Sequence, residues 1–383
     1  MRRSLVVLIV DALGWRSACE TPGFAPSLPH RRRIETILGF SSGALPTLFT
    51  GRMPSEHGRW LMFQRARARS PFAGFHWTRV LPPRVQRSEA LRRMLSRVVE
   101  RRGVRGYFHL YDVPRWLLPQ FDIAEREDIF APGGLPVDSL WDAVERRGLS
   151  WRRWNWRTPE AENLQQIERC VASAEPAVMV CYTAELDAAL HHEGTNGAGV
   201  RTRLGRYSAL LERLAAVGAA ADRAPWLYLV SDHGMVDVSA TVDVMGRLAR
   251  LPVRWPRDYL AFFDSTMARF WWRGEKGRAA VTDALAAEPR GRWLGDPELS
   301  RLGALFPARE YGDAVFLLDP GVLMAPSFMG KQPLAAMHGY DPSHPDMAAL
   351  LWSNRPVPES VRRLADVRGF LEAELDALRA EAA

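Results

Sequence analysis

Acidic and histidine side chains follow two short apolar runs of the sequence, in positions where they could bind a metal ion. Asp11 directly follows the run at 5–10, and Asp232 and His233 come just after the run at 226–230. A carboxylate and an imidazole both suit zinc and related divalent ions. Each residue is also consistent with a cap or a turn, so metal binding depends on whether further ligands lie nearby.

A second group of possible ligands follows a third apolar run, at 176–182. Asp187 and His191 are four residues apart, and this spacing places both side chains on one face of a helix. His338 lies much later in the chain, before Gly339, and would supply a third ligand if that pair shares an ion. A surface aspartate and histidine at this spacing are the alternative interpretation.

A hydroxyl that could act as a nucleophile comes from Ser41 or Ser42. Both precede an apolar run at 44–49 that predicts a short helix ending at Gly51. The N–H groups at the start of a helix favour negative charge, so this position suits a phosphate and lowers the pKa of a hydroxyl. The backbone N–H of Ser42 or Gly43 could contact a developing oxyanion. A serine that only caps the helix is the alternative.

The elements that position these side chains predict an α/β fold. The three runs are short, apolar and typical of strands buried on both faces of a sheet. Ligands bind beyond the carboxyl ends of such strands, where the acidic and histidine residues follow. Further strands are expected at 267–272 and 314–318. Helices are expected in the ranges 88–102, 136–148, 201–217 and 278–287, from about Pro345, and in the tail from Pro358.

We therefore expect a three-layer sandwich, with a central, mostly parallel sheet, helices on both faces and a small α/β insertion as a cap. Residues 1–383 would form one domain with insertions at about 60–135 and 258–310 that cover the active site. The first insertion begins at Trp60, which we expect to contact substrate. The alternating Trp and Arg residues at 151–157 fit either base stacking or a surface strand with its indoles packed inward.

Composition narrows the class of protein further. The chain has 383 residues, is 47% hydrophobic, and carries a formal net charge of +7 that comes almost entirely from arginine. Such a charge suits phosphate esters, nucleic acid or acidic lipid headgroups. The three cysteines have no metal-ligand spacing, and a reduced, cytoplasmic location is expected. The first apolar run is too short for a signal peptide, and no run is long enough to span a membrane.

Taken together, the motifs resemble the alkaline phosphatase superfamily, and within it the type I phosphodiesterase and nucleotide pyrophosphatase branch. Their order and rough spacing match along the whole chain, and the set is far more specific than any one motif. The matching segments are LVVLIVDALGW at 5–15, FSSGALPTLFTGRMPSEHG at 40–58, YTAELDAALHHEG at 182–194, LVSDHGM at 229–235 and MHGYDPSHPDM at 337–347.

The resemblance implies two divalent ions, with zinc expected and Mn²⁺ or Mg²⁺ as alternatives. It places Ser41 at the nucleophile position, where this branch usually has threonine, and Ser42 remains the alternative. The sulfatase branch needs a C/S-x-P-x-R context, which this segment lacks. One ion would be held by Asp187, His191 and His338, and the other by Asp11, Asp232 and His233 together with Ser41.

The expected function is a metal-dependent phosphodiesterase or nucleotide pyrophosphatase that forms a phosphoseryl intermediate, because two ions can clamp the attacking and leaving oxygens of phosphoryl transfer. A phosphomonoesterase, phosphonate hydrolase or phospho-group transferase could use the same site. A nucleic-acid or glycan-binding protein with a vestigial site is less consistent with an intact ligand set. A Ser-His-Asp hydrolase would leave two histidines unexplained. The substrate could be a nucleotide, a nucleotide sugar or a phospholipid headgroup; nucleic acid is not excluded, and the oligomeric state is open.

Overall fold

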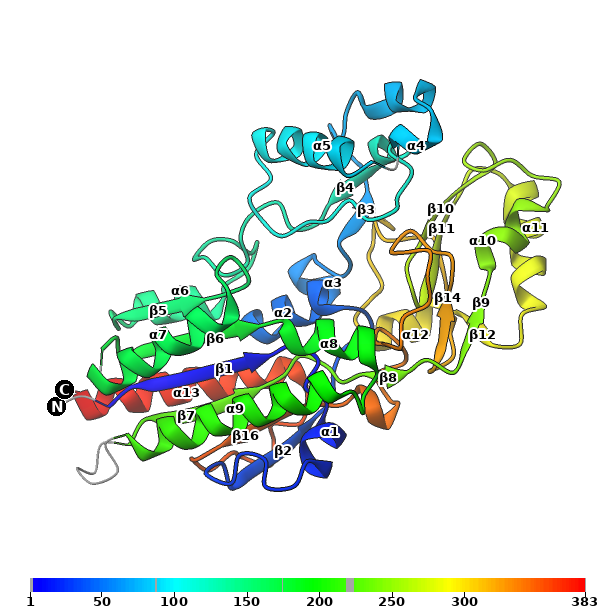
Figure 1. The fold of residues 1–383 in the computed structure, drawn as a ribbon. Helices are drawn as coiled ribbons and strands as arrows, with labels where there is room; N and C mark the ends of the chain where they lie inside the picture. Colours follow the sequence, from blue (N-terminus) through cyan, green and yellow to red (C-terminus); the bar gives the residue numbers. More distant parts are fainter. Residues whose placement is uncertain (1–2, 87, 174, 218–223, 383) are drawn as a thin grey trace.

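A six-stranded sheet forms the centre of the molecule, in a computed structural model that describes residues 3–86, 88–173, 175–217 and 224–382 (Figure 1). Its four strands β7, β1, β6 and β5 are mutually parallel, whereas β16 runs antiparallel to both of its neighbours, β2 and β7. The predicted central, mostly parallel sheet is therefore confirmed. In spatial order the strands are β2 (His30–Ile34), β16 (Ala349–Ser353), β7 (Trp226–Val230), β1 (Leu5–Val10), β6 (Val178–Thr183) and β5 (Trp151–Trp154).

The apolar runs are continuous because both faces of the sheet are covered by helices. In β1, Leu5, Val7 and Ile9 join one buried cluster, and the alternate residues of the strand join another. Successive side chains of a strand point to opposite faces, so a strand between two helical layers needs apolar residues throughout. The first layer contains α2 (Ser41–Thr50), α6 (Leu140–Arg146) and α13 (Leu364–Ala382). The second contains α1 (Trp15–Glu20), α7 (Glu160–Ser173), α8 (Glu185–Glu193) and α9 (Ala198–Ala216).

One predicted helix is wrong. The segment that begins at Pro345 forms only a short 3₁₀ turn, η4 (Pro345–Met347), and then enters β16. A short apolar run cannot be assigned to helix or strand from periodicity alone. Here the gap between β7 and β2 decides the outcome, because all five residues of β16 are buried there.

The other predicted helices are present, with shifted ends. Ser88 caps α5 (Glu89–Arg101) through its side chain. Ser139 caps α6 and forms a capping box with Asp142. The remaining helices are α3 (Pro54–His57), α4 (Pro83–Gln86), α10 (Val244–Ala249), α11 (Glu275–Ala286) and α12 (Asp296–Arg301). None of the described helices is long and apolar enough to cross a lipid bilayer.

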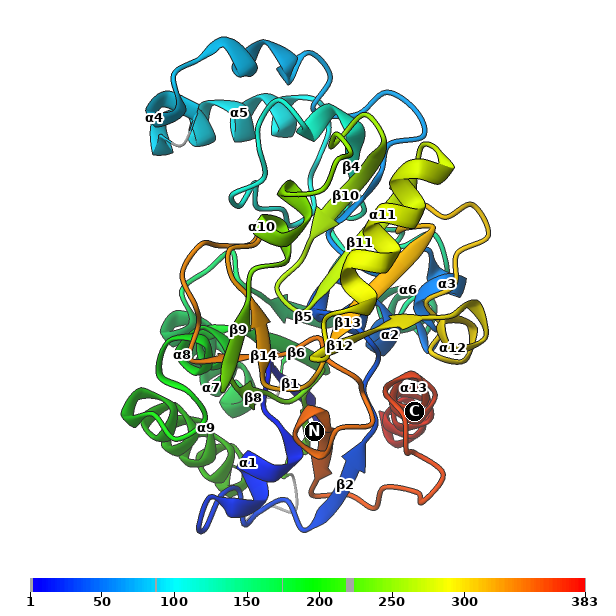
Figure 2. The same ribbon diagram turned by 90° about the vertical axis from the view of Figure 1, so that its right-hand side faces the viewer.

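A second, smaller sheet lies beyond the carboxyl ends of the central strands (Figure 2). Its strands are antiparallel and pair in the order β10 (Tyr259–Phe263), β11 (Met267–Trp272), β13 (Ala314–Leu318) and β12 (Gly291–Leu294). The expected insertion at 258–310 therefore extends to Leu318, because β13 pairs with both β11 and β12. Short two-stranded pairs link the rest: β3 (Phe63–Arg65) with β4 (Phe121–Ile123), β8 (Val236–Asp237) with β15 (Ala336–Met337), and β9 (Ala240–Val242) with β14 (Val322–Met324).

The segment 60–135 packs against this second sheet and projects beyond it. It contains β3, the 3₁₀ turns η1 (Phe75–Val80) and η2 (Leu118–Gln120), α4, α5 and β4. Its apolar residues share one buried cluster with β10 and β11. In Figure 1, η1, α4 and α5 lie at the end of the molecule farthest from the central sheet.

Arginine is concentrated on both edge strands of the central sheet. β2 has the sequence HRRRI, in which Arg31 and Arg33 are exposed, and β5 has the sequence WRRW, in which Arg152 is exposed. The indole of Trp154 is buried in the helical layer, and that of Trp151 stacks on Trp141. The segment 151–154 is thus a strand with its indoles packed inward.

Candidate active site

The carboxyl ends of three adjacent parallel strands bring the predicted ligands together. β1 lies between β6 and β7, and Asp11, Thr183 and Ser231 mark the points where the three strands end. Asp11 and the Asp232–His233 pair come directly after β1 and β7, and β6 leads into α8, which carries Asp187 and His191. The strand order therefore brings ligands that are far apart in the sequence into one cluster.

One group of possible ligands consists of Asp11, Asp232 and His233, all buried. The His233 Nε2 lies 3.4 Å from Asp11 Oδ1 and 3.3 Å from Asp232 Oδ2. The other ring nitrogen, Nδ1, lies 3.0 Å from the Gly234 carbonyl oxygen and can donate a hydrogen bond to it. That bond leaves the lone pair of Nε2 facing two carboxylates, which is the arrangement of a histidine that binds a cation.

Asp232 is held so that only one of its oxygens is free. Its Oδ1 accepts hydrogen bonds from the backbone N–H groups of Ala12, at 3.2 Å, and His233, at 3.1 Å. Its Oδ2 is buried and has no hydrogen-bond partner among the described residues. Ala12 adopts a left-handed conformation, with φ of 61°, which is uncommon for a residue with a side chain. The backbone at the end of β1 is thus shaped around this carboxylate.

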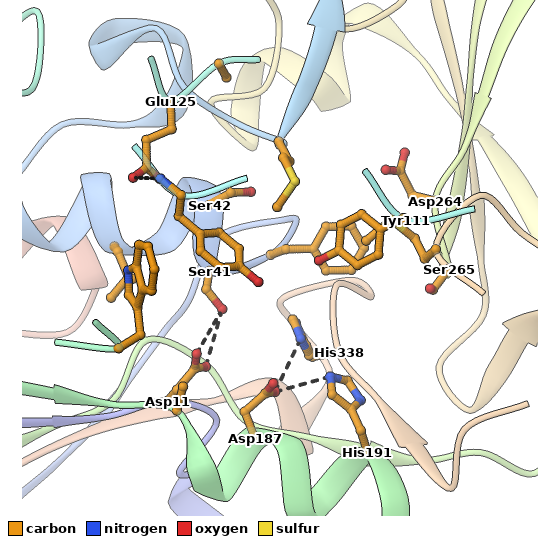
Figure 3. Close-up of a pocket in the computed structure, with 18 of the residues that line it drawn as sticks. Asp11, Ser41, Ser42, Tyr111, Glu125, Asp187, His191, Asp264, Ser265 and His338 are labelled. Atoms are coloured by element: carbon orange, nitrogen blue, oxygen red, sulfur yellow. Dashed lines mark hydrogen bonds and ion pairs between the residues drawn. The ribbon is translucent and has the colours of Figure 1, made fainter. Parts of the chain in front are cut away.

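The second group consists of Asp187, His191 and His338. The Nε2 atoms of His191 and His338 lie 3.3 Å and 3.6 Å from Asp187 Oδ1 (Figure 3). His191 Nδ1 lies 2.9 Å from the carbonyl oxygen of Ala336 in β15, which again orients Nε2 toward the group. The rings of His338 and His233 stack with centroids 3.9 Å apart and so connect the two groups.

The electrostatics of both groups fit bound cations. Burial and the charges of Asp232 and Asp187 raise the pKa of Asp11 well above its ordinary value. Burial and the two neighbouring histidines lower the pKa of His338 well below its ordinary value. Asp187 Oδ1, like Asp232 Oδ2, is a buried acceptor without a hydrogen-bond partner among the described residues. Buried acids normally find a partner, and a divalent cation in each group would supply it.

Ser41 lies beside the first group, and Ser42 points elsewhere. Ser41 Oγ is 3.0 Å from His233 Nε2 and 3.3 Å and 3.4 Å from the Asp11 carboxylate oxygens. Ser42 Oγ instead donates a hydrogen bond to the backbone carbonyl of Trp60, at 3.3 Å. Ser41 is the first residue of α2, so its hydroxyl also lies at the positive end of a helix.

Two predicted substrate contacts are wrong. The indole of Trp60 is only 1% exposed, packs against Phe306 and Tyr311, and donates from Nε1 to the Leu38 carbonyl. The Gly43 N–H is not free to contact an oxyanion, because it donates to the Phe40 carbonyl at 2.8 Å. Gly43 serves packing instead, since a Cβ there would lie 2.5 Å from the Trp60 carbonyl oxygen.

Tyr182 contacts the site, although the sequence did not predict it as a site residue. It lies in β6, and its hydroxyl donates a hydrogen bond to Asp11 Oδ2. It stands at the end of an apolar strand and begins the matching segment at 182–194, but neither feature indicates that its hydroxyl contacts Asp11.

A cavity of about 390 Å³ opens from Ser41 toward the insertion at 60–135. Aromatic side chains form much of its wall. Trp156 belongs to the Trp and Arg segment 151–157, for which base stacking was one expectation, whereas Tyr107 and Tyr111 were not singled out in the sequence. No lysine or arginine is among the described residues that line it, although the chain as a whole is basic.

Two buried acids also reach the cavity. Asp264 is paired with the buried Arg269, with Nε and Oδ2 2.8 Å apart. Glu125 accepts a hydrogen bond from the Tyr107 backbone N–H at 2.8 Å (Figure 3). Burial raises the pKa of Glu125 to about 7. The irregular, aperiodic sequence of the insertion at 60–135 gives no signal for the Glu125 contact.

Comparison with known proteins decides the family. The model of the type I phosphodiesterase / nucleotide pyrophosphatase family matches residues 5–341. The chain belongs to this family. It is therefore a metal-dependent phosphodiesterase in class, and the resemblance inferred from the motifs is confirmed. A search of curated proteins found no match.

Solved structures of the same fold include two mammalian proteins. Murine ectonucleotide pyrophosphatase/phosphodiesterase 5 aligns with a TM-score of 0.66 and 15% identity, over 98% of this chain and 95% of that chain. The human protein aligns over the same shares with a TM-score of 0.65 and 14% identity. An inactive variant of the murine protein in complex with AMP gives a TM-score of 0.65 and 16% identity, again over 98% and 95%. At these identities the likeness establishes the fold.

Proposed function

We propose that this protein hydrolyses phosphodiesters through nucleophilic attack by Ser41, supported by a divalent ion in each of the two ligand groups. The observation that carries the proposal is the place of Ser41 Oγ, within hydrogen-bond reach of both Asp11 and His233 at the start of α2. When bound, the ions lower the pKa of the hydroxyl and neutralise charge on the phosphoryl oxygens. Two carboxylates with one imidazole, and one carboxylate with two imidazoles, are ligand sets that favour zinc.

The protein's own residues orient the nucleophile. A hydroxyl has one proton, so Ser41 donates to either Asp11 or His233 at a time, and both contacts aim Oγ toward the cavity. Tyr182 and the backbone carbonyl of Gly234 fix Asp11 and His233 from behind. The backbone N–H groups of Ser41 and Ser42, at the open end of α2, are placed to hold a phosphoryl oxygen.

The reaction proceeds in two displacements. The bond from Ser41 Oγ to phosphorus forms as the bond to the leaving alcohol breaks, and the alcohol takes up a proton. Water then attacks the phosphoseryl phosphorus, which releases Ser41 and a phosphomonoester. The Ser42 hydroxyl takes no part in either step, because it donates to the Trp60 carbonyl.

The cavity supports a diester over a monoester and over a polyphosphate. A diester places an organic group on each side of phosphorus, and the wall of the cavity offers Phe40, Tyr107 and Tyr111 to receive one of them. A polyphosphate leaving group would need cationic side chains, and the described lining contains none. We therefore propose a substrate with a flat or apolar organic group and an uncharged leaving alcohol. The AMP bound to the murine neighbour supports a nucleoside monophosphate as that group.

A small substrate panel tests the proposal. We expect the purified, metal-loaded protein to hydrolyse bis-p-nitrophenyl phosphate and the p-nitrophenyl ester of thymidine monophosphate, and to act much more slowly on p-nitrophenyl phosphate and on ATP. Faster turnover of the monoester would make the protein a phosphomonoesterase. Equal turnover of ATP would contradict the assignment of the leaving group.

A further inference from the structure

Most of the net positive charge of the chain comes from one short segment. Residues 75–102, here called the helical projection, contain eight arginines and two glutamates, a net charge of +6 against +7 for the whole chain. The projection comprises η1, α4 and α5 and stands at the end of the molecule farthest from the central sheet (Figures 1 and 2). The rest of the molecule is therefore nearly neutral.

The projection also carries most of the large apolar side chains that the described chain leaves exposed. There are six of these, and four lie in the projection: Trp77, Val80, Val85 and Met94, exposed by 48%, 85%, 42% and 44%. The other two, Tyr107 and Trp156, line the cavity beside Ser41. Scattered exposed apolar residues are normal on a protein surface, but such a concentration indicates a contact surface.

These exposed residues are not the edge of the projection's own core. In α5 the inward-facing residues are Leu91, Leu95 and Val99, and all three are buried in the cluster that contains β10 and β11. The opposite stripe is Arg93, Arg97 and Arg101, all exposed, with Met94 beside it. The side chains of Arg97 and Arg101 have no ion pair or hydrogen bond within the described chain, and neither has that of Arg84 on α4.

We infer that the helical projection docks the protein on a membrane surface that contains anionic phospholipids. Exposed guanidinium groups attract the anionic headgroups, and the exposed apolar side chains of the same segment enter the boundary between headgroups and acyl chains. Nucleic acid fits the charge equally well, but of the four exposed apolar side chains only Trp77 offers a base a stacking surface, whereas Val80, Val85 and Met94 do not. The aliphatic residues therefore favour lipid.

Docking at the projection would hold the active site close to the membrane. The chain that leaves α5 at Arg102 reaches Tyr107 five residues later, and Tyr107 is both exposed and part of the cavity wall. The same covalent segment thus carries the docking surface and one wall of the site. The inference does not depend on which phosphodiester is hydrolysed, because it rests on the surface alone.

Co-sedimentation of the full-length protein with phospholipid vesicles tests the inference. We expect the protein to sediment with phosphatidylcholine vesicles that contain phosphatidylglycerol, not with phosphatidylcholine alone, and to be released by salt. The triple substitution Arg93→Gln, Arg97→Gln, Arg101→Gln should weaken binding about 100-fold, at roughly 1 kcal/mol for each arginine near the surface. The double substitution Val80→Ser, Val85→Ser should also weaken vesicle binding, although it leaves the net charge of the protein unchanged.

A matched control removes the same charge elsewhere. Arg301, Arg362 and Arg379 are exposed and lie outside the projection, so the triple glutamine variant at these positions should bind vesicles like wild type. All variants should keep wild-type turnover of bis-p-nitrophenyl phosphate without vesicles, which shows that they are folded.

Four results would overturn the inference. One is equal vesicle binding by the 93/97/101 variant and by wild type. Another is an effect of the control triple as large as that of the projection triple. Tighter binding to a DNA or RNA duplex than to vesicles, lost in the same variant, would assign the projection to nucleic acid. A wild-type dimer in sedimentation equilibrium that the valine variant dissociates would assign it to a second copy of the chain.

Discussion

At the scale of single residues, the two adjacent serines have different environments. The oxygen of Ser41 faces Asp11 and His233, and that of Ser42 faces the Trp60 carbonyl. Their backbones are neighbours at the start of one helix, so the difference comes from the direction of the side chains. Substitutions at the two positions should therefore have opposite outcomes.

Ser41→Ala should reduce turnover of bis-p-nitrophenyl phosphate by at least roughly a thousandfold, since it removes the atom that attacks phosphorus. Ser42→Ala is the matched control and should keep turnover within about tenfold of wild type, because its hydroxyl only bonds a carbonyl. Steady-state kinetics with metal content checked in parallel distinguishes them. Loss of activity in the Ser42 variant alone would move the nucleophile to that residue.

Glu125 makes the stability of the protein depend on pH. Burial raises its pKa to about 7, from the ordinary value of 4.5. The folded state thus binds this proton more tightly than the unfolded state, so the stabilisation is complete below about pH 4.5 and is lost as pH rises toward 7. Between these pH values the free energy of unfolding falls by about 3 kcal/mol because of this one carboxyl.

Glu125→Gln should remove that dependence while keeping an oxygen that accepts from the Tyr107 N–H. In urea unfolding at pH 5 and pH 8, the free energy of unfolding of the variant should exceed that of wild type only at pH 8. Glu100→Gln, on the exposed face of α5, should show no such difference. An equal gain at both values would mean that the Glu125 carboxyl does not titrate in this range.

At the scale of elements, the turn after β7 depends on Gly234 for space. A Cβ at Gly234 would lie 2.0 Å from the backbone oxygen of Asp346. The glycine therefore allows the chain before β16 to approach the Asp232–His233 turn closely, and its φ lies outside the left-handed range. Close approach, rather than a sharp turn, explains this glycine.

Gly234→Ala should destabilise the fold by about 1–3 kcal/mol, because one of the two backbones must shift to admit the added methyl group. It should also weaken metal binding in the group that contains Asp232. The control is Gly205→Ala in the middle of α9, where a Cβ meets nothing within 4 Å and the helix should gain about 1 kcal/mol. Thermal unfolding measures the stability of the two variants, and metal titration measures their metal affinity. A stable Gly234 variant with full metal affinity would contradict the close approach.

The elements also show which parts of the site the sequence could predict. The ligands after β1, β6 and β7 were predictable, because an apolar run that stops at an acid marks a strand end and a spacing of four marks a helix face. The grouping of the ligands around two ions was predicted only from the resemblance to a family, because no single motif reveals the order of the strands in the sheet. Tyr107, Tyr111 and Glu125 lie in an aperiodic insertion, where no repeating pattern indicates which side chains turn toward the cavity.

The errors have physical causes of the same kind. Trp60 lies beside a basic, proline-rich stretch that suggests a surface, but its indole packs on Phe306, more than two hundred residues away. β16 is apolar and short, and only the gap between its two neighbours makes it a strand. Both outcomes depend on contacts between distant segments.

At the scale of the whole molecule, bound ions should contribute to stability as well as to catalysis. Without them the buried carboxylates of Asp11 and Asp232 and the half-buried carboxylate of Asp187 lie close together, which is unfavourable. An ion at a hundredfold its dissociation constant would add about 2.7 kcal/mol for each site.

Chelation should therefore lower the melting temperature and abolish turnover, and added Zn²⁺ should restore both. Metal analysis should find two equivalents in wild type and one in His338→Ala. A melting temperature indifferent to chelator would contradict the assignment of these clusters as cation sites. Full restoration by Mn²⁺ but not by Zn²⁺ would keep the sites and change the ion.

The arginines on the two edge strands have a consequence for colloidal behaviour. An open sheet ends in rows of unpaired backbone groups, to which a strand of another molecule can add. In this protein one edge, β2, has the sequence HRRRI and the other, β5, has WRRW. A second molecule approaching either edge meets like charge before any backbone hydrogen bond can form. These arginines thus protect the sheet from aggregation by strand addition, separately from any binding of substrate or lipid.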